Sequence, residues 1–313
     1  VSEEIFADLA RQAPMQRLLQ GEVGSGKTLV ALRAMLAVVD TRGQAVLLAP
    51  TEVLAQQHFQ TITGLLGELG QGHVLGAPET ATDVVCITGS TPAARKRAAL
   101  MQIASGEAGI IIGTHALLAD NVSFADLGLV VIDEQHRFGV EQRALLTDRA
   151  HARPHVLVLT ATPIPRSVAM TVFGDLTVST LAQLPAGRAD VTTTVVDATR
   201  RPAWVERAWE RVAEEVAQGR QAFVVAPHIG GGKEADGLGV VELAARLSEG
   251  PLAGVRVGVL HGRLPAEEKA TVMGAFAAGE VDVLVATTII EVGVDVPNAT
   301  MMIIWDADRF GIS

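Results

Sequence analysis

A glycine-rich loop at residues 21–28, GEVGSGKT, has the residue types and spacing that hold a polyphosphate. It fits the pattern G-x-x-x-x-G-K-[ST], follows a short apolar run at residues 17–20 and opens a stretch of helical spacing at residues 29–39. Glycines let the main chain wrap an anion, so that N–H groups and the positive end of the helix dipole face the phosphates. A glycine-rich turn that only caps a helix is the alternative, but such a match arises by chance in roughly one chain per hundred. We assign to nucleotide binding Gly21, Glu22, Val23, Gly24, Ser25, Gly26, Lys27 and Thr28.

Two side chains of this loop can act on the bound triphosphate. Lys27 can reach the β- and γ-phosphate oxygens, which makes it a catalytic candidate. Thr28 offers its hydroxyl to Mg²⁺. A nucleoside triphosphate and Mg²⁺ are therefore the predicted cofactors.

A second carboxylate is needed at the end of a neighbouring strand to hold that metal, and residues 127–136, LGLVVIDEQH, provide one. Asp133 is predicted to bind Mg²⁺, directly or through water. Glu134 would position and deprotonate the attacking water, and His136 would couple the γ-phosphate to neighbouring elements. A strand that ends in Asp-Glu is by itself often only a solvated terminus, so the functional interpretation depends on the phosphate loop.

The segment at residues 157–166, LVLTATPIPR, is a further apolar run that ends in small hydroxyl residues and prolines. Its loop would lie at the carboxyl edge of the sheet, where open α/β folds place their ligands. Thr160 and Thr162 can then exchange hydrogen bonds with the acidic loop. Taken alone, the chemistry favours an ordinary strand that stops at proline.

The elements that must position these groups follow an alternation of apolar runs and stretches of helical spacing, which is typical of helices crossing over a parallel sheet. In the first half the runs lie at residues 17–20, 45–49, 84–88, 109–113, 129–132 and 155–160. After a segment rich in Pro, Gly and Thr, the second half has runs at residues 222–226, 255–260, 281–286 and 301–304, with a helix expected at 265–277. We predict an α/β protein with a first domain at residues 1–183, a linker at 184–194 and a second domain at 195–313. The glycine-rich stretch at 230–239 has no strand-to-helix setting and is predicted to be a surface loop.

Length and composition agree with two domains and exclude several classes of protein. At 313 residues, 49% of them hydrophobic, the chain exceeds one ordinary domain. It has neither an apolar stretch of the roughly 18 residues that cross a bilayer nor a signal sequence, so a cytoplasmic protein with no membrane partner is expected. Cys86 is the only cysteine, which excludes a disulfide or a cysteine-ligated metal within this chain. The net charge of -10 argues against a broadly basic nucleic-acid binder.

Seven motifs, in order along nearly the whole chain, resemble the motif series of the superfamily 2 helicases. They are GEVGSGKT (21–28), LAPTEVLAQQH (48–58), GTHALL (113–118), DEQH (133–136), TATPIPR (160–166), HGRLPAEEK (261–269) and ATTIIEVGVDVP (286–297). Three segments are more similar to the bacterial RecG helicases than to the transcription-repair coupling factor, namely residues 133–143, 168–176 and 183–188. The resemblance implies two tandem RecA-like P-loop domains, each a mostly parallel sheet flanked by helices, with ATP as the nucleotide.

The resemblance also implies roles for residues that carry no chemical signal of their own. Gly293 and Asp295 match the second-domain motif that closes over the nucleotide. Contacts to the DNA backbone are implied for Pro50, Thr51, Thr114, His115, His261, Thr287 and Thr288. Such contacts are indifferent to base sequence. For His115 and His261, a structural role near a strand end is an equal alternative.

The function implied is that of an ATP-dependent DNA helicase or translocase on branched or forked DNA, in Holliday junction branch migration, fork reversal, recombination and repair. A single-stranded DNA-binding protein is a candidate second partner, and a monomer is expected because both nucleotide-clasping halves lie in one chain. One alternative is a translocase of the coupling-factor type. The other is a noncatalytic scaffold, against which Lys27, Thr28, Asp133 and Glu134 argue.

The sequence departs from the family pattern at both ends. It stops at residues 306–313, where the family continues into an arginine-rich motif that reaches the γ-phosphate; loss of such a cation lowers phosphoryl transfer ~10³-fold or more. The adenine-recognition segment and the wedge domain are expected before residue 1. We therefore expect a helicase core cut from a longer protein, with weak ATP binding and slow hydrolysis on its own.

Overall fold

The computed structural model describes residues 1–72, 74, 76–78, 80–119, 121–133, 153–161, 176–182, 191–230, 239–287 and 296–310. The chain divides into two compact units, Val1–Ala189 and Asp190–Ser313. The linker predicted at residues 184–194 falls partly outside the described residues, so its bounds stay a prediction. None of the described helices is both long and apolar enough to cross a membrane.

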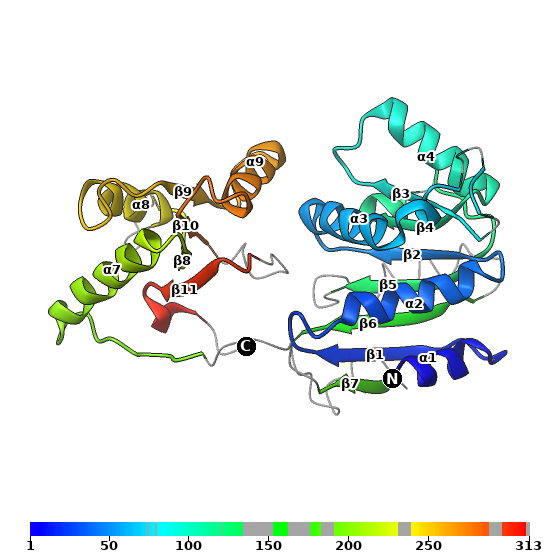
Figure 1. Ribbon diagram of the computed structural model, residues 1–313, viewed down its shortest axis with the longest axis horizontal. Helices are drawn as coiled ribbons and strands as arrows, with labels where there is room; N and C mark the ends of the chain where they lie inside the picture. The colour runs from blue at the N-terminus through cyan, green and yellow to red at the C-terminus, as the bar shows by residue number, and fades with distance from the viewer. Residues whose placement is uncertain are drawn as a thin grey trace. The chain divides into compact units, whose positions relative to one another are not determined.

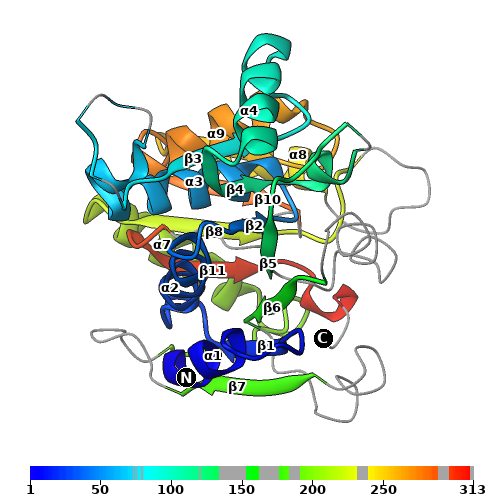
Figure 2. The same ribbon diagram turned by 90° about the vertical axis from the view of Figure 1, so that its right-hand side faces the viewer.

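The first unit is built on a parallel sheet of seven strands in the order β3-β4-β2-β5-β6-β1-β7. Both ribbon views show the sheet running from β3 at the top to β7 at the bottom (Figures 1 and 2). The strands are β1 (Gln16–Gly21), β2 (Gln44–Leu48), β3 (Asp83–Ile87), β4 (Ala108–Gly113), β5 (Leu127–Asp133), β6 (His155–Thr160) and β7 (Thr177–Leu181). Because every pair is parallel, all the carboxyl ends lie at one edge of the sheet.

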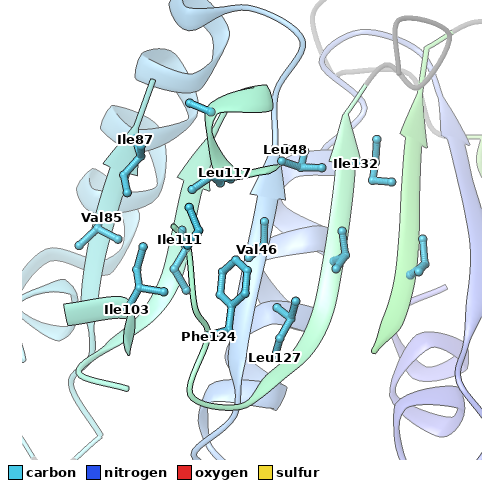
Figure 3. Close-up of a cluster of buried hydrophobic side chains, with 14 of the residues drawn as sticks. Val46, Leu48, Val85, Ile87, Ile103, Ile111, Leu117, Phe124, Leu127 and Ile132 are labelled. Atoms are coloured by element: carbon cyan, nitrogen blue, oxygen red, sulfur yellow. The ribbon is translucent and has the colours of Figure 1, made fainter. Parts of the chain in front are cut away.

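Helices cover both faces of this sheet, which explains why its central strands are apolar at almost every position. The helical elements are α1 (Ser2–Leu9), α2 (Lys27–Val39), α3 (Glu52–Leu66), α4 (Ala93–Ser105), η1 (Gly67–Gly70) and η2 (His115–Leu118). On the face covered by α4, Ile103 packs with alternate strand residues such as Val46 and Ile111 (Figure 3). Helices α2 and α3 lie on the other face (Figure 1).

The second unit repeats the plan on a smaller parallel sheet with the order β11-β8-β10-β9. Trp209 of α7 and Leu243 of α8 pack on one face, and Phe276 of α9 packs on the other. The elements are α7 (Pro202–Ala217), β8 (Gln221–Val225), α8 (Val240–Glu249), β9 (Val257–Leu260), α9 (Ala266–Ala277), β10 (Val283–Ala286), β11 (Ala299–Ile304) and η5 (Ala307–Arg309).

The α/β class with two parallel sheets flanked by helices is confirmed. Each predicted apolar run overlaps a strand. Two elements had no signal in the sequence. Strand β7 is an edge strand in which only Ser179 is buried, so it shows no apolar run. Helix α1 precedes the first run and depends on contacts made far along the chain. The predicted surface loop at 230–239 lies mostly outside the described residues.

Candidate functional site

The loop between β1 and α2 has the backbone that the glycine pattern predicts. Gly24 and Gly26 have φ angles of 78° and 88°, in the left-handed region that favours glycine. Gly26 is also the N-cap residue of α2. At Gly21 a Cβ atom would stand 2.6 Å from Ser25 Oγ and 3.0 Å from Leu181 Cβ, so a side chain there would force the loop open.

The side chains of Lys27 and Ser25 turn toward the main chain of this loop. Lys27 Nζ donates to the carbonyl oxygens of Gly21 and Glu22, each at 2.8 Å, so its side chain lies back across the loop. Ser25 Oγ is buried and has no hydrogen-bond partner in the described part of the chain. A loop that gathers a lysine and a buried hydroxyl around its own main chain fits a phosphate group, whose oxygens can accept from all of them.

Asp133 ends β5 at the same edge of the sheet. It is in register with Leu159 of β6, which is in register with Leu19 of β1, two residues before the loop. Two strand spacings place Asp133 roughly 10 Å from Leu19. The predicted metal ligand and the phosphate loop are thus neighbours across one intervening strand.

The Asp133 carboxylate is mostly buried and bonded to a histidine. His58 Nε2 lies 2.7 Å from Asp133 Oδ2, and the two side chains are 11% and 12% exposed. His58 is the last residue of the motif at residues 48–58, and the sequence alone predicts no role for it. No local signal could have revealed the pair, because 75 residues separate its members.

The donors that the described residues offer suit Mg²⁺ bound with a triphosphate. Mg²⁺ usually takes one or two carboxylates together with phosphate oxygens and water, not a cage made by the protein alone. Asp133 supplies a carboxylate and Thr28 a hydroxyl. Within the described ranges no three His, Cys, Asp or Glu side chains gather as a metal site of their own. Glu134, His136, Thr288, Gly293 and Asp295 lie outside the described residues, so their roles stay predictions.

Four predicted DNA contacts of the first unit come together beside the predicted nucleotide site. Leu48 of β2 pairs with Gly113 of β4, and Ala49 N donates to Gly113 O at 2.8 Å. The residues that follow these two strands are therefore neighbours at the carboxyl edge: Pro50, Thr51, Thr114 and His115.

The two threonines use their side chains locally. Thr51 Oγ1 accepts from Leu54 N at 3.3 Å and caps α3. Thr114 is 1% exposed and accepts from Ala116 N at the start of η2. Among the four, Thr114 is thus the least accessible to a ligand, whereas His115 is exposed.

In the second unit, His261 and Thr287 follow the paired strands β9 and β10. Leu260 is in register with Ala286, and Thr287 N donates to Leu260 O at 3.2 Å. His261 Nδ1 is buried without a hydrogen-bond partner in the described ranges, and Thr287 is buried as well. The structure therefore brings these two predicted residues together at the carboxyl edge of the second sheet.

Comparison with known proteins agrees with this geometry. Residues 3–171 match the DEAD/DEAH box helicase family, and residues 207–312 match the helicase conserved C-terminal domain. The chain belongs to the DEAD/DEAH box helicases. The two matches fall in the two structural units.

Within this helicase family the predicted resemblance to RecG is confirmed. The chain is 56% identical to ATP-dependent DNA helicase RecG of Mycobacterium leprae over 99% of its own length and 43% of that protein. It is 46% identical to the RecG helicase of Synechocystis over all of its length and 36% of that protein. It thus spans less than half of the curated relatives it matches.

A solved structure of RecG bound to a three-way DNA junction is similar in fold to this helicase chain. The two are 39% identical with a TM-score of 0.75, over 99% of this chain and 38% of that one. The RecA-like helicase fold is therefore shown.

The remaining predictions for this helicase chain concern Thr160 and the cysteine. Thr160 is buried and in register with Gln20 of β1, while Thr162 lies outside the described residues. Burial, with a further effect of Glu52, raises the pKa of the Cys86 thiol to about 11. The thiol thus stays protonated near neutral pH.

Proposed function

We propose that this chain is the motor of an ATP-dependent DNA helicase that acts on branched or forked DNA, in Holliday junction branch migration and the reversal of stalled forks. The observation that carries the proposal is the shared sheet edge, where the Gly21–Thr28 loop and Asp133 lie beside the DNA-contact candidates after β2 and β4. The 39% identity to a RecG bound to a three-way DNA junction supports branched DNA as the partner.

In the proposed reaction the nucleotide is held by main-chain N–H groups of the loop. Bound Mg²⁺ would neutralise charge on the phosphate oxygens, with Thr28 and Asp133 as its protein ligands. Lys27 would leave the carbonyl oxygens of Gly21 and Glu22 for the β- and γ-phosphate oxygens. Glu134 would take a proton from the attacking water, and His136 would bond to the γ-phosphate.

The second unit would supply the other set of DNA contacts, from His261, Thr287 and Thr288. Gly293 and Asp295 would bind the nucleotide when the motor closes. Alternation between the two sets of phosphate contacts would then move the protein along duplex DNA in an inchworm manner. With both helicase domains in one chain, a monomer in the cytoplasm suffices, and single-stranded DNA-binding protein is the proposed second partner.

The test is ATP hydrolysis and unwinding by the complete protein. Lys27→Ala should lower DNA-stimulated hydrolysis roughly 10²- to 10³-fold, as the loss of one positioned donor does in other enzymes, and Glu134→Gln should abolish unwinding. Lys96→Ala, which removes a lysine from α4, is the matched control and should behave as the unsubstituted protein. Full DNA-stimulated hydrolysis in both the Lys27 and Glu134 variants would refute the proposal.

The choice of DNA distinguishes the proposed helicase from a coupling-factor translocase. Forked DNA should stimulate hydrolysis more than linear duplex or single-stranded DNA of the same length. Equal stimulation by forked and linear duplex would favour the translocase.

A further inference from the structure

We propose that His58 is a positioning residue for Asp133 and that helix α3, through His58, links the predicted DNA contact at Thr51 to the predicted magnesium ligand. This inference rests on the proposed function and adds to it a route between its two ligands. The juxtaposition that carries it is the buried bond of 2.7 Å between His58 Nε2 and Asp133 Oδ2.

The chemistry of the pair fixes the direction of this bond. A carboxylate that binds Mg²⁺ is ionised and has no proton to give, so in the proposed site the imidazole Nε2–H donates to Oδ2. A carboxylate held through one oxygen has a fixed rotamer, which aims its other oxygen, Oδ1, in one direction. Groups that bond to a metal ligand from behind orient it in this way, and their loss commonly lowers metal affinity 10- to 100-fold.

Helix α3 places His58 and Thr51 on one side of the same rigid element. Thr51 caps the helix and His58 follows seven residues later, which is about two turns and roughly 10 Å along the axis. Residues at this spacing lie on one face. A movement of the capped end would therefore be passed to the Asp133 carboxylate.

Packing holds α3 firmly enough for this role. Leu54 and Ile62, before and after His58 on the helix, are buried, and α3 packs on β3 and β4. In the first turn, Glu52 accepts hydrogen bonds from both the N–H and the hydroxyl of Ser90 in the loop after β3. The helix is thus tied to its surroundings at its beginning and along its buried face.

A purely structural role is the competing interpretation, because a buried carboxylate needs a hydrogen-bond donor whatever its function. The two roles differ in what a substitution changes. A structural role predicts a lower melting temperature only. A positioning role predicts a changed requirement for Mg²⁺ in a protein that is still folded.

The experiment compares His58→Leu, His58→Asn and His58→Gln in the complete protein. Leu removes the donor, Asn is too short to bring its amide to the place of Nε2, and Gln can put its amide nitrogen there. Ile62→Val, one turn further along α3, is the matched control because it loosens the same buried face without touching Asp133. The first readout is the Mg²⁺ dependence of binding of a fluorescent ATP analogue, followed by anisotropy. The second is the ratio of hydrolysis with and without forked DNA.

We expect the Leu and Asn variants to need about tenfold more Mg²⁺ for half-maximal binding and to lose most of the stimulation by DNA. The Gln variant should stay within about threefold of the unsubstituted protein on both measures, as fits a retained donor. Ile62→Val should melt at a lower temperature with an unchanged Mg²⁺ requirement. If the Leu variant does not fold, the Asn and Gln pair gives the same comparison.

Unchanged Mg²⁺ dependence in folded Leu or Asn variants would overturn the positioning role, and unchanged DNA stimulation would overturn the link through α3. These failures differ from a failure of the proposed function. In that case the unsubstituted protein itself would show neither Mg²⁺-dependent nucleotide binding nor stimulation by DNA.

Discussion

Two halves of one sheet edge treat their polar groups in different ways. In the nucleotide half, formed by the carboxyl ends of β1, β5 and β6, glycines with positive φ curve the main chain and Ser25 Oγ is buried without a partner in the described ranges. In the threonine half, formed by the carboxyl ends of β2, β3 and β4, Thr51 and Thr114 cap the helices that follow. The nucleotide half thus has a buried hydroxyl that can bind a ligand. In the threonine half, the Thr51 and Thr114 hydroxyls are already hydrogen-bonded to the main chain.

This difference bears on how DNA would be bound. With Thr51 and Thr114 in their capping bonds, the exposed predicted contact for a phosphate on the threonine half is His115. Such contacts carry no base sequence information, which suits a motor that moves along any DNA.

The nucleotide half should be the more sensitive to added bulk. Gly21→Ala places a Cβ 2.6 Å from Ser25 Oγ and 3.0 Å from Leu181 Cβ, so we expect nucleotide affinity to fall roughly tenfold or more, or about 1.4 kcal/mol. Calorimetric titration with a nonhydrolysable ATP analogue measures this. Gly64→Ala on α3, where a Cβ meets nothing within 4 Å, is the control. An affinity equal to that of the unsubstituted protein would show that the loop is not closed in the bound state.

Thr51→Ala tests the threonine half. Loss of the cap should lower the free energy of unfolding by ~1 kcal/mol and reduce stimulation by DNA, while hydrolysis without DNA stays unchanged. Thr51→Ser keeps the cap and should restore both. Denaturant unfolding and ATPase assays check this. Loss of hydrolysis without DNA in the Thr51→Ala protein would show that the threonine half also serves nucleotide hydrolysis.

Thr114→Val should have a smaller effect on DNA. Because Thr114 is 1% exposed, we expect its hydroxyl to make no contact with a phosphate. DNA affinity should then change by less than about twofold, under 0.5 kcal/mol. Fluorescence anisotropy with labelled forked DNA measures the affinity. A large loss in a protein that melts normally would mean that Thr114 turns outward when DNA binds.

His155 lies at the amino end of β6, away from both halves of the carboxyl edge, and should make the stability of the fold depend on pH. Burial lowers the pKa of His155, partly offset by Asp8, and its Nδ1 accepts from Met15 N at 2.9 Å. Folded His155 therefore takes up a proton less readily than His155 in the unfolded chain. Its contribution to the free energy of unfolding is fully present above pH ~6.5. This contribution is lost as the pH falls from ~6.5 through the lower pKa of folded His155. His155→Asn should flatten this part of the unfolding profile, and an unchanged profile would assign the acid sensitivity to other groups.

The sequence predicted what local patterns can specify. The glycine pattern located the phosphate loop, and in the described part of the chain apolar runs located the strands that are buried on both faces. Contacts between distant residues could not be predicted. Helix α1 is held by Arg17, whose guanidinium donates to Asp8 at 3.0 Å and also bonds Ser179 of β7. Neither this network nor the bond of His58 to Asp133 leaves a periodic signal, because each joins residues that only the folded sheet brings together.

A crystal structure of this protein with Mg²⁺ and a nonhydrolysable ATP analogue would show directly whether the Gly21–Thr28 loop and Asp133 bind the nucleotide and its metal. We expect the phosphates to lie against the N–H groups of residues 24–28, with the metal bound by Thr28 and Asp133. Phosphates bound away from the loop, or a metal that neither residue contacts, would contradict this expectation.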